Sequence, residues 1–276
     1  MTKRTSFKIG DIDIGLDAPL FLMAGPCVIE SEESCLEIAK RLAQISDRTG
    51  VKILFKASFD KANRSSFSSY RGPGLVRGME ILARVRDETG LPVMTDVHEP
   101  DQAGQAAATV DCLQVPAFLC RQTDLLWACA ETGTPISVKK GQFLSPAEMA
   151  NVVDKIRACQ NDKVILTERG TFFGYNRLVN DMTGIAVMQQ LGCPVVFDAT
   201  HSTQQPGGLG AASGGRPEMS PLLARAAVAA GANGLFLEVH PNPEKALSDA
   251  ASMLPLEGLE DLVRVCKGIF EVAHGR

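Results

Sequence analysis

The chain has 276 residues, of which 45% are hydrophobic and 22% are charged, and its net charge at pH 7 is −4. This composition is typical of a globular protein with a sizeable core, and the acidic balance argues against nucleic acid as the main partner. No segment approaches the roughly 18 consecutive apolar residues of a membrane span, so we expect no contact with a membrane. The basic N-terminus has no apolar segment behind it and therefore differs from a secretory signal peptide.

The first predicted element is a β-hairpin that precedes the main fold. Residues Phe7 to Ile14 form two short alternating runs of apolar and polar residues around Gly10-Asp11. We therefore expect residues 1–19 to form an N-terminal hairpin extension.

Strand-like and helical segments then alternate to the end of the chain, and no change of composition marks a linker. Ser31, followed by two glutamates, predicts the start of a helix, and Gly50 predicts its end. Gly90 and Gly133 likewise follow segments of helical spacing, just before the chain restarts as strand. The predicted strands are Phe21–Ala24, Ile53–Ala57, Val93–Val97, Cys112–Val115, Ile136–Lys139, Val164–Thr167, Val195–Asp198 and Gly234–Glu238.

Continuous apolar strands indicate the fold class. Such strands suit a parallel sheet that is covered on both faces. Eight β/α units in a chain of this length predict a (β/α)₈ TIM barrel, with residues 1–276 as one domain and the hairpin as a plug in the barrel floor. A doubly wound open sheet is the alternative.

The eight cysteines are scattered and form no Cys-x-x-Cys pair. In a chain of this length the pattern is typical of reduced thiols, which favours a cytoplasmic protein over a disulfide-bonded one. Most of these side chains are expected to be small buried residues. Cys27 is the exception, because it follows the first predicted strand in Gly25-Pro26-Cys27.

Charged and polar residues follow every predicted strand, at the end where a (β/α)₈ barrel carries its active site. The densest group follows the second strand, where two Lys, one Arg, one Asn and three Ser occur within residues 56–66. Such cations repel one another unless an anion lies among them, and the Ser hydroxyls add donors for a phosphate. A single charged residue after a strand is usually solvated, but recurrence at all eight ends predicts a polyanionic ligand. The strand-end residues are Cys27, Glu30, Lys56, Lys61, Asn63, Arg64, Ser65, Asp96, His98, Glu99, Gln114, Arg121, Lys139, Lys140, Glu168, Arg169, Asp198, His201, Glu238 and His240.

A metal site is the second prediction from these strand ends. The first, seventh and eighth strands of a closed barrel are neighbours, so Cys27, His201 and Glu238 can point at one ion, with a fourth group completing the set. A thiolate, an imidazole and carboxylates suit a borderline divalent ion such as Zn²⁺, Fe²⁺ or Mn²⁺. The alternative is a packed core thiol and a hydrogen-bonded strand-end histidine.

Nine motifs stand out from about residue 20 onward. They are AGPCVIES (24–31), FKASFDKANRSS (55–66), YRGPG (70–74), TDVHEP (95–100), LQVPAFLCRQTDL (113–125), VKKGQFLSP (138–146), FDATHS (197–202), GAASGGR (210–216) and EVHPNP (238–243). Together they resemble the 3-deoxy-D-manno-octulosonate 8-phosphate synthase family. KANRSS (61–66) is the most specific piece, since the related 3-deoxy-D-arabino-heptulosonate 7-phosphate synthases typically carry a KPRTS-like loop there.

The resemblance implies a (β/α)₈ barrel that assembles as a homotetramer. It also implies a transferase activity: condensation of phosphoenolpyruvate with D-arabinose 5-phosphate and water, with release of phosphate, on the route to lipopolysaccharide. Metal-independent members of the family have Asn where this chain has Cys27, so the resemblance implies one divalent ion per subunit (Zn, Fe, Mn or Co). The implied ligands are Cys27, His201, Glu238 and Asp249; Asp249 stands in Ser248-Asp249-Ala250, not in the Asp-Gly pair that is common in the family.

The resemblance also divides the site between the two substrates. Phosphoenolpyruvate is expected among Lys56, Lys61, Lys139 and Arg169, and Arg121 is expected to reach the sugar phosphate from a neighbouring subunit. Arabinose 5-phosphate is expected beside Asn63, Arg64 and Ser65, and Asp96 and Gln114 are expected to be further substrate-binding residues. The residues expected to act in catalysis are Lys56, Lys61, Lys139, Arg169, His201 and Asp249, with His201 a ligand first and a proton carrier second.

Three other functions are compatible with parts of the sequence. A Schiff-base aldolase would use Lys139 or Lys140 as nucleophile and would need no metal ligands. A non-catalytic sugar-phosphate sensor would need the cations but not the four ligands together. The heptulosonate synthase, which takes erythrose 4-phosphate as acceptor, is the alternative within the family.

Overall fold

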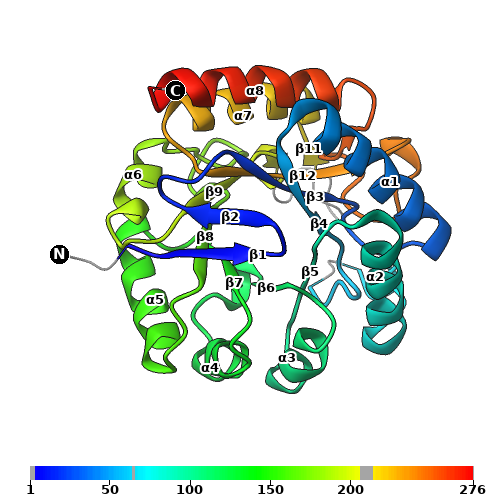
Figure 1. The fold of residues 1–276 in the computed structure, drawn as a ribbon, viewed down its shortest axis with the longest axis horizontal. Coiled ribbons are helices and arrows are strands. Elements are labelled where there is room, and N and C mark those ends of the chain that lie inside the picture. Colours follow the sequence, from blue (N-terminus) through cyan, green and yellow to red (C-terminus); the bar gives the residue numbers. More distant parts are fainter. Residues whose placement is uncertain (1–3, 64–65, 206–213, 276) are drawn as a thin grey trace.

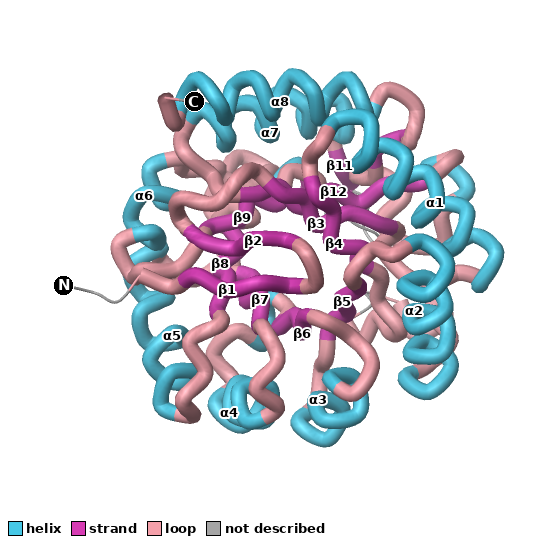
Figure 2. The backbone as a smooth tube through the Cα atoms, viewed as in Figure 1, coloured by secondary structure: helices cyan, strands magenta, loops and turns pink. Residues whose placement is uncertain are grey.

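Parallel strands form a closed barrel inside a ring of helices, as the alternation of segments predicted (Figures 1 and 2). The computed structural model describes residues 4–63, 66–205 and 214–275. The barrel closes because β12 pairs with β3 on one side and with β9 on the other. Its strands are β3 (Phe21–Gly25), β4 (Lys52–Lys56), β5 (Val93–Asp96), β6 (Cys112–Val115), β7 (Ile136–Lys139), β8 (Val164–Glu168), β9 (Val195–Asp198) and β12 (Gly234–His240).

The helices cover the outside of the barrel and pack their apolar faces against the strands. The predicted caps of the first helix are confirmed: the Ser31 side chain accepts a hydrogen bond from the Ser34 N–H, and Gly50 ends the helix in the left-handed region at φ 68°. The helices are α1 (Glu32–Thr49), α2 (Leu75–Thr89), α3 (Pro100–Ala107), α4 (Thr123–Glu131), α5 (Met149–Ala158), α6 (Thr183–Gln189), α7 (Ser220–Ala229) and α8 (Leu259–Ala273). Of the helices in the described ranges, none has both the length and the apolar character needed to cross a bilayer.

The predicted N-terminal hairpin consists of β1 (Ser6–Ile9) and β2 (Ile12–Gly15), and Figure 1 shows it in dark blue across the middle of the ring. Its isoleucines Ile9, Ile12 and Ile14 are buried. They pack in one cluster with inward-facing barrel residues such as Met23 and Phe236. The hairpin therefore closes the N-terminal end of the barrel, opposite the strand ends that carry the charged residues.

Three short strands lie among the loops beyond the C-terminal strand ends. β10 (Gln204–Gln205) pairs with β11 (Gly214–Gly215), and β13 (Leu254–Pro255) pairs with the end of β12. Gly25, the last residue of β3, lies against β4 so closely that an added Cβ would come within 2.1 Å of the Lys56 carbonyl oxygen. The absence of a side chain at Gly25 thus lets the segments that carry Cys27 and Lys56 lie side by side.

Candidate active site

The C-terminal strand ends surround a cavity of about 890 Å³. A cavity of this size can take a small-molecule ligand or two. Most of the site residues expected from the sequence line it, and they come from strands all around the barrel. These lining residues are Lys56, Lys61, Asn63, Asp96, Gln114, Lys139, Arg169, His201 and Asp249.

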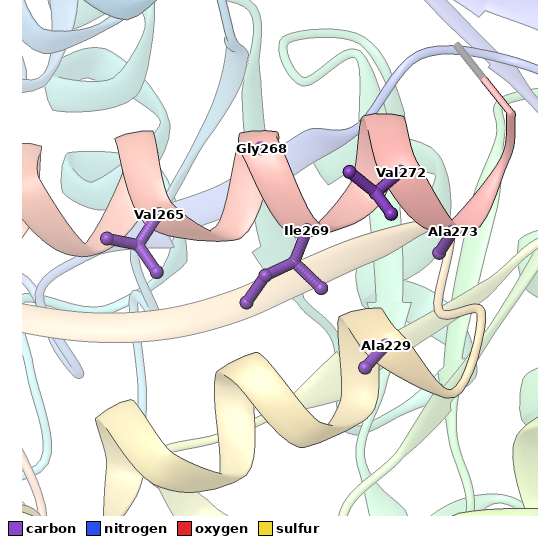
Figure 3. Close-up of a pocket in the computed structure, with 6 residues that line it drawn as sticks. All are labelled: Ala229, Val265, Gly268, Ile269, Val272 and Ala273. Atoms are coloured by element: carbon purple, nitrogen blue, oxygen red, sulfur yellow. The ribbon is translucent and has the colours of Figure 1, made fainter.

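A second depression, between α7 and α8, is of a different kind. It measures about 500 Å³, and Figure 3 shows that aliphatic side chains such as Val265, Ile269 and Val272 line it. None of its lining residues carries a titratable or hydrogen-bonding side chain. The depression therefore lacks groups for chemistry, and the barrel cavity is the candidate active site.

Two lysines lie on one side of the cavity. The Nζ atom of Lys56 is buried, donates to Ser58 Oγ at 2.7 Å and lies 3.3 Å from Asp96 Oδ1. The Nζ atom of Lys61 lies 3.9 Å from Glu238 Oε1. Burial disfavours the charged form of Lys61, but the nearby Cys27 and Glu238 outweigh burial and raise its pKa. Lys61 is therefore a cation at neutral pH.

Lys139 and Arg169 lie on the other side of the cavity, and both are buried. Burial lowers the pKa of Lys139 and that of Arg169, against the opposing effect of Asp198. The Nη2 atom of Arg169 donates to Gln204 Oε1 at 2.8 Å, whereas Nη1 has no hydrogen-bond partner among the described residues. A buried guanidinium with an unused donor is suited to bind an anion.

Cys27, Glu238 and Asp249 form a group that could hold a metal ion, since each offers one donor atom within 4.8 Å of the others. The Cys27 Sγ atom lies 3.1 Å from Asp249 Oδ2. His201 completes the predicted set, because its Nε2 atom lies 3.5 Å from Glu238 Oε2 and 3.6 Å from Asp249 Oδ2. The structure thus brings together all four residues that the sequence suggested as ligands.

The environment of this group fits a cation. Both carboxylate oxygens of Glu238 are buried without a hydrogen bond from any described residue. Burial raises the pKa of the Cys27 thiol, and the charges of Asp249 and Glu238 raise it further. Burial opposes a charge on His201, yet Asp198 and Glu238 outweigh it and raise the His201 pKa. The negative charge of Glu238 and Asp249, which favours a proton on nearby groups, would also attract a divalent ion.

Asp198 is a site residue whose role the sequence did not reveal. It is fully buried, and its Oδ2 atom lies 2.6 Å from Lys139 Nζ and 2.7 Å from His201 Nδ1. Its Oδ1 atom accepts the His201 backbone N–H at 2.9 Å. Burial alone would raise the Asp198 pKa, but His201 and Lys139 hold it far below its usual range. The sequence placed Asp198 only among the polar strand-end residues, and its Asp-x-x-His spacing indicates no more than a contact with His201 within one turn.

Ser248 and His98 also lie at the site; the sequence did not single out Ser248, and it placed His98 among the strand-end residues without a role of its own. The Oγ atom of Ser248 lies 2.8 Å from Cys27 Sγ. The Nε2 atom of His98 lies 3.1 Å from Asp96 Oδ2, and its buried Nδ1 has no described partner. Both residues line the cavity.

One predicted substrate residue that the structure describes does not line the cavity, and two others fall outside the described residues. Arg121 is exposed outside the cavity, where its carbonyl oxygen accepts a hydrogen bond from Lys155. Arg64 and Ser65 lie outside the described residues. Lys140, one of the two lysines considered for a Schiff base, is completely buried and donates to the carbonyl oxygens of Gly141 and Leu144.

The fold and the site together define a class of protein. A (β/α)₈ barrel that gathers Lys56, Lys61, Lys139 and Arg169 beside a metal-capable group of ligands has the equipment of an enzyme for anionic substrates. The chain belongs to the DAHP synthetase I family, whose model matches residues 2–273.

Individual relatives match over nearly the whole length. The chain is 52% identical over 270 residues to the 2-dehydro-3-deoxyphosphooctonate aldolase of Syntrophotalea carbinolica, a match that covers 98% of each chain. It is 54% identical over 269 residues to the protein of the same name from Thioalkalivibrio sulfidiphilus, covering 98% of this chain and 96% of the relative. The identity to the Acidithiobacillus ferrooxidans protein of that name is 55% over 269 residues, with the same coverage.

Proposed function

We infer that the protein is a 3-deoxy-D-manno-octulosonate 8-phosphate synthase, which condenses phosphoenolpyruvate with D-arabinose 5-phosphate and water and releases phosphate. The observation that carries this inference is the identity of 52% to 55%, over almost the full chain, to relatives named for the octulosonate product. Their name favours this reading over the heptulosonate synthase. The product is a precursor of the sugar that bacteria place in lipopolysaccharide.

The phosphoenolpyruvate site is proposed among Lys56, Lys61, Lys139 and Arg169. Phosphoenolpyruvate carries a carboxylate and a phosphate, so it needs several cations in one place. The unused Nη1 donor of Arg169 and the raised pKa of Lys61 support this assignment. Lysine and arginine held beside the phosphate would also stabilise the charge that develops on it before it leaves.

The arabinose 5-phosphate site is proposed on the adjoining side of the cavity. Asp96 and Gln114 are paired in register on neighbouring strands, and both line the cavity. The buried Gln114 Oε1 atom has no described partner, which suits a sugar hydroxyl. Asn63 is exposed at the rim, and we propose that it binds this substrate together with Arg64 and Ser65.

The metal site is proposed at Cys27, His201, Glu238 and Asp249, with one divalent ion per subunit (Zn, Fe, Mn or Co). When bound, such an ion supplies a Lewis acid that polarises an oxygen atom. Asp198 would fix the imidazole of His201, since a carboxylate on Nδ1 leaves Nε2 to face the ligands. We propose that His201 and Asp249 serve as ligands in catalysis and that His201 is secondarily a proton carrier.

The proposed contribution of the chain to catalysis is largely positioning. Two phosphorylated substrates held together in one cavity react as if in a single molecule, an effect that lowers the activation free energy of the reaction by up to about 7–11 kcal/mol. We also propose a cytoplasmic homotetramer, in which Arg121 reaches the sugar phosphate of a neighbouring subunit. The free state of all eight cysteines and the position of Arg121 outside its own cavity support that proposal.

An acceptor comparison tests the proposed function. The purified protein should release phosphate from phosphoenolpyruvate with arabinose 5-phosphate and give the eight-carbon product by mass spectrometry. A higher kcat/KM with erythrose 4-phosphate would identify the heptulosonate synthase instead. Borohydride treatment with a carbonyl substrate tests the Schiff-base alternative, for which Lys139 remains the suitable lysine because it lines the cavity. Covalent labelling of Lys139 would contradict our proposal.

A further inference from the structure

Ser248 makes a buried contact with the sulfur of Cys27. The Ser248 Oγ atom lies 2.8 Å from Cys27 Sγ, although the two residues are 221 positions apart in the chain. Ser248 is 3% exposed and Cys27 is 0% exposed. Among the described residues, Cys27 is the one hydrogen-bond partner of the Ser248 side chain. A hydroxyl of this kind can donate to a thiolate, which is an acceptor without a proton of its own.

The loop that carries Ser248 is turned so that two consecutive side chains reach the same sulfur. Asp249 has a φ of +48°, a left-handed conformation that is uncommon for a residue other than glycine. Its carbonyl oxygen accepts the backbone N–H groups of Ser252 at 2.9 Å and Met253 at 3.2 Å, which hold the turn. As a result the Asp249 carboxylate lies 3.1 Å from Cys27 Sγ while the Ser248 hydroxyl approaches the same atom.

We propose that Ser248 is a positioning residue of the metal site. Its hydroxyl would donate a hydrogen bond to the Cys27 thiolate, and this bond would orient the other lone pairs of the sulfur toward the ion. The inference rests on the proposed metal site and adds a residue to it. Partners of this kind orient the ligand and tune its electron donation to the metal. Their removal typically lowers metal affinity about 10- to 100-fold.

A merely structural role would be to hold the loop in place, and the chain offers a separate residue for that role. The Glu30 Oε1 atom accepts the Leu247 backbone N–H at 2.8 Å, so Glu30 fastens the same loop without touching Cys27 Sγ. Glu30→Ala is therefore the matched control: it loosens the loop but leaves the Ser248 contact to sulfur intact. Ser248→Thr keeps the hydroxyl and serves as the conservative variant.

The experiment is a Co²⁺ titration of the metal-depleted full-length protein, followed by the absorption band for charge transfer from sulfur to cobalt. Ser248→Ala should bind Co²⁺ about 10- to 100-fold more weakly. Its band should move to lower energy, because the sulfur loses a donor that withdraws electron density. Ser248→Thr should keep the wild-type band. Glu30→Ala should keep the wild-type band energy even if the variant binds Co²⁺ more weakly.

The outcomes separate this inference from the proposal beneath it. Wild-type affinity and band energy in Ser248→Ala would overturn the role of Ser248 and leave the metal site standing. The same band shift in Glu30→Ala would reduce Ser248 to a loop residue and also overturn the inference. A wild-type protein that shows no cobalt–thiolate band would overturn the metal site itself, and the role of Ser248 with it.

Discussion

The Nζ atom of Lys139 lies 2.6 Å from Oδ2 of Asp198, and the same oxygen is hydrogen-bonded to the imidazole of His201. One buried carboxylate thus joins a cation of the proposed phosphoenolpyruvate site to a residue of the proposed metal site. The positions of Lys139, at the end of β7, and of His201, just after β9, therefore both depend on the Asp198 side chain.

Asp198→Ala should destabilise the protein strongly, because it leaves Lys139 as a buried cation without its partner. Breaking a buried ion pair in this way costs about 3–5 kcal/mol. Urea unfolding of the wild type and the variant measures the change. Asp13→Ala, which removes the exposed ion pair with Lys8, is the control and should change stability far less. Equal losses in the two variants would contradict the special role of Asp198.

Removal of the metal should abolish turnover. The reason is the set of Cys27, His201, Glu238 and Asp249, whose charges and free oxygens fit a divalent ion. Phosphate release should stop after exhaustive chelation and return on addition of Mn²⁺, Co²⁺ or Zn²⁺, with circular dichroism as the control for folding. Full activity in a sample with no detectable metal would refute the requirement.

Replacement of Cys27 distinguishes a ligand from a packed thiol. Cys27→Ala should lose both metal and activity. Cys27→Asn should also lose metal but retain more activity, resistant to chelators, because Asn is what the metal-independent members carry. Metal analysis and phosphate release with and without chelator measure both variants. If Cys27→Ala bound as much metal as the wild type, Cys27 would not belong to the site.

Arg64→Ala should weaken the binding of arabinose 5-phosphate more than the binding of phosphoenolpyruvate. Arg64 belongs to the KANRSS segment, the part of the loop most specific to the octulosonate synthases. Loss of a charged contact in a desolvated site costs about 2–5 kcal/mol of binding free energy. Calorimetry with each substrate tests this division, and Lys61→Ala, with the opposite preference expected, is its counterpart. Equal losses for both substrates in Arg64→Ala would show that the division is wrong.

The free energy of unfolding should decrease as the pH is lowered into the acid range, and Asp96 should account for part of this decrease. Burial alone would raise the pKa of Asp96, but Lys56, His98 and Lys61 together outweigh burial and lower the pKa well below its ordinary value. A carboxyl with a lowered folded-state pKa stabilises the protein fully above its unfolded pKa of about 3.9 and loses this contribution as the pH falls below it. Asp96→Asn should therefore reduce the slope of unfolding free energy against pH by up to about 1.4 kcal/mol per unit, between about pH 5 and the onset of acid unfolding. An unchanged slope in urea titrations across this range would contradict the assignment.

The sequence predicted the barrel because its strands are apolar throughout and its helices carry clear stops. The strands that begin at Cys112, Ile136 and Val195 have the predicted bounds. Others run on past their apolar residues: β8 includes Glu168, and β12 continues to His240. In β8 and β12 the strand continues past the last predicted residue into the site, whereas β4 and β5 end one residue before the predicted Ala57 and Val97.

The sequence located residues at the cavity where a charged residue type indicates its chemistry, and it missed contacts that depend on the folded geometry. Lys61 and Arg169 reach the cavity as expected, since charged strand ends converge in any barrel of this kind. The contact of Ser248 with Cys27 depends on a turn at Asp249 that no sequence spacing indicates. A serine in a loop is too common a residue to signal a role before the chain is folded.

Gly25 sets a limit on how this protein can vary. Every amino acid other than glycine would place a carbon atom 2.1 Å from the Lys56 carbonyl oxygen, and the nearest atoms all belong to the Lys56 backbone, so no side chain can move aside. Every missense change at this codon therefore meets the same obstacle, whatever its polarity or size. A mutant library built to alter the specificity of the site can randomise the loops around the cavity, but it should keep this codon fixed.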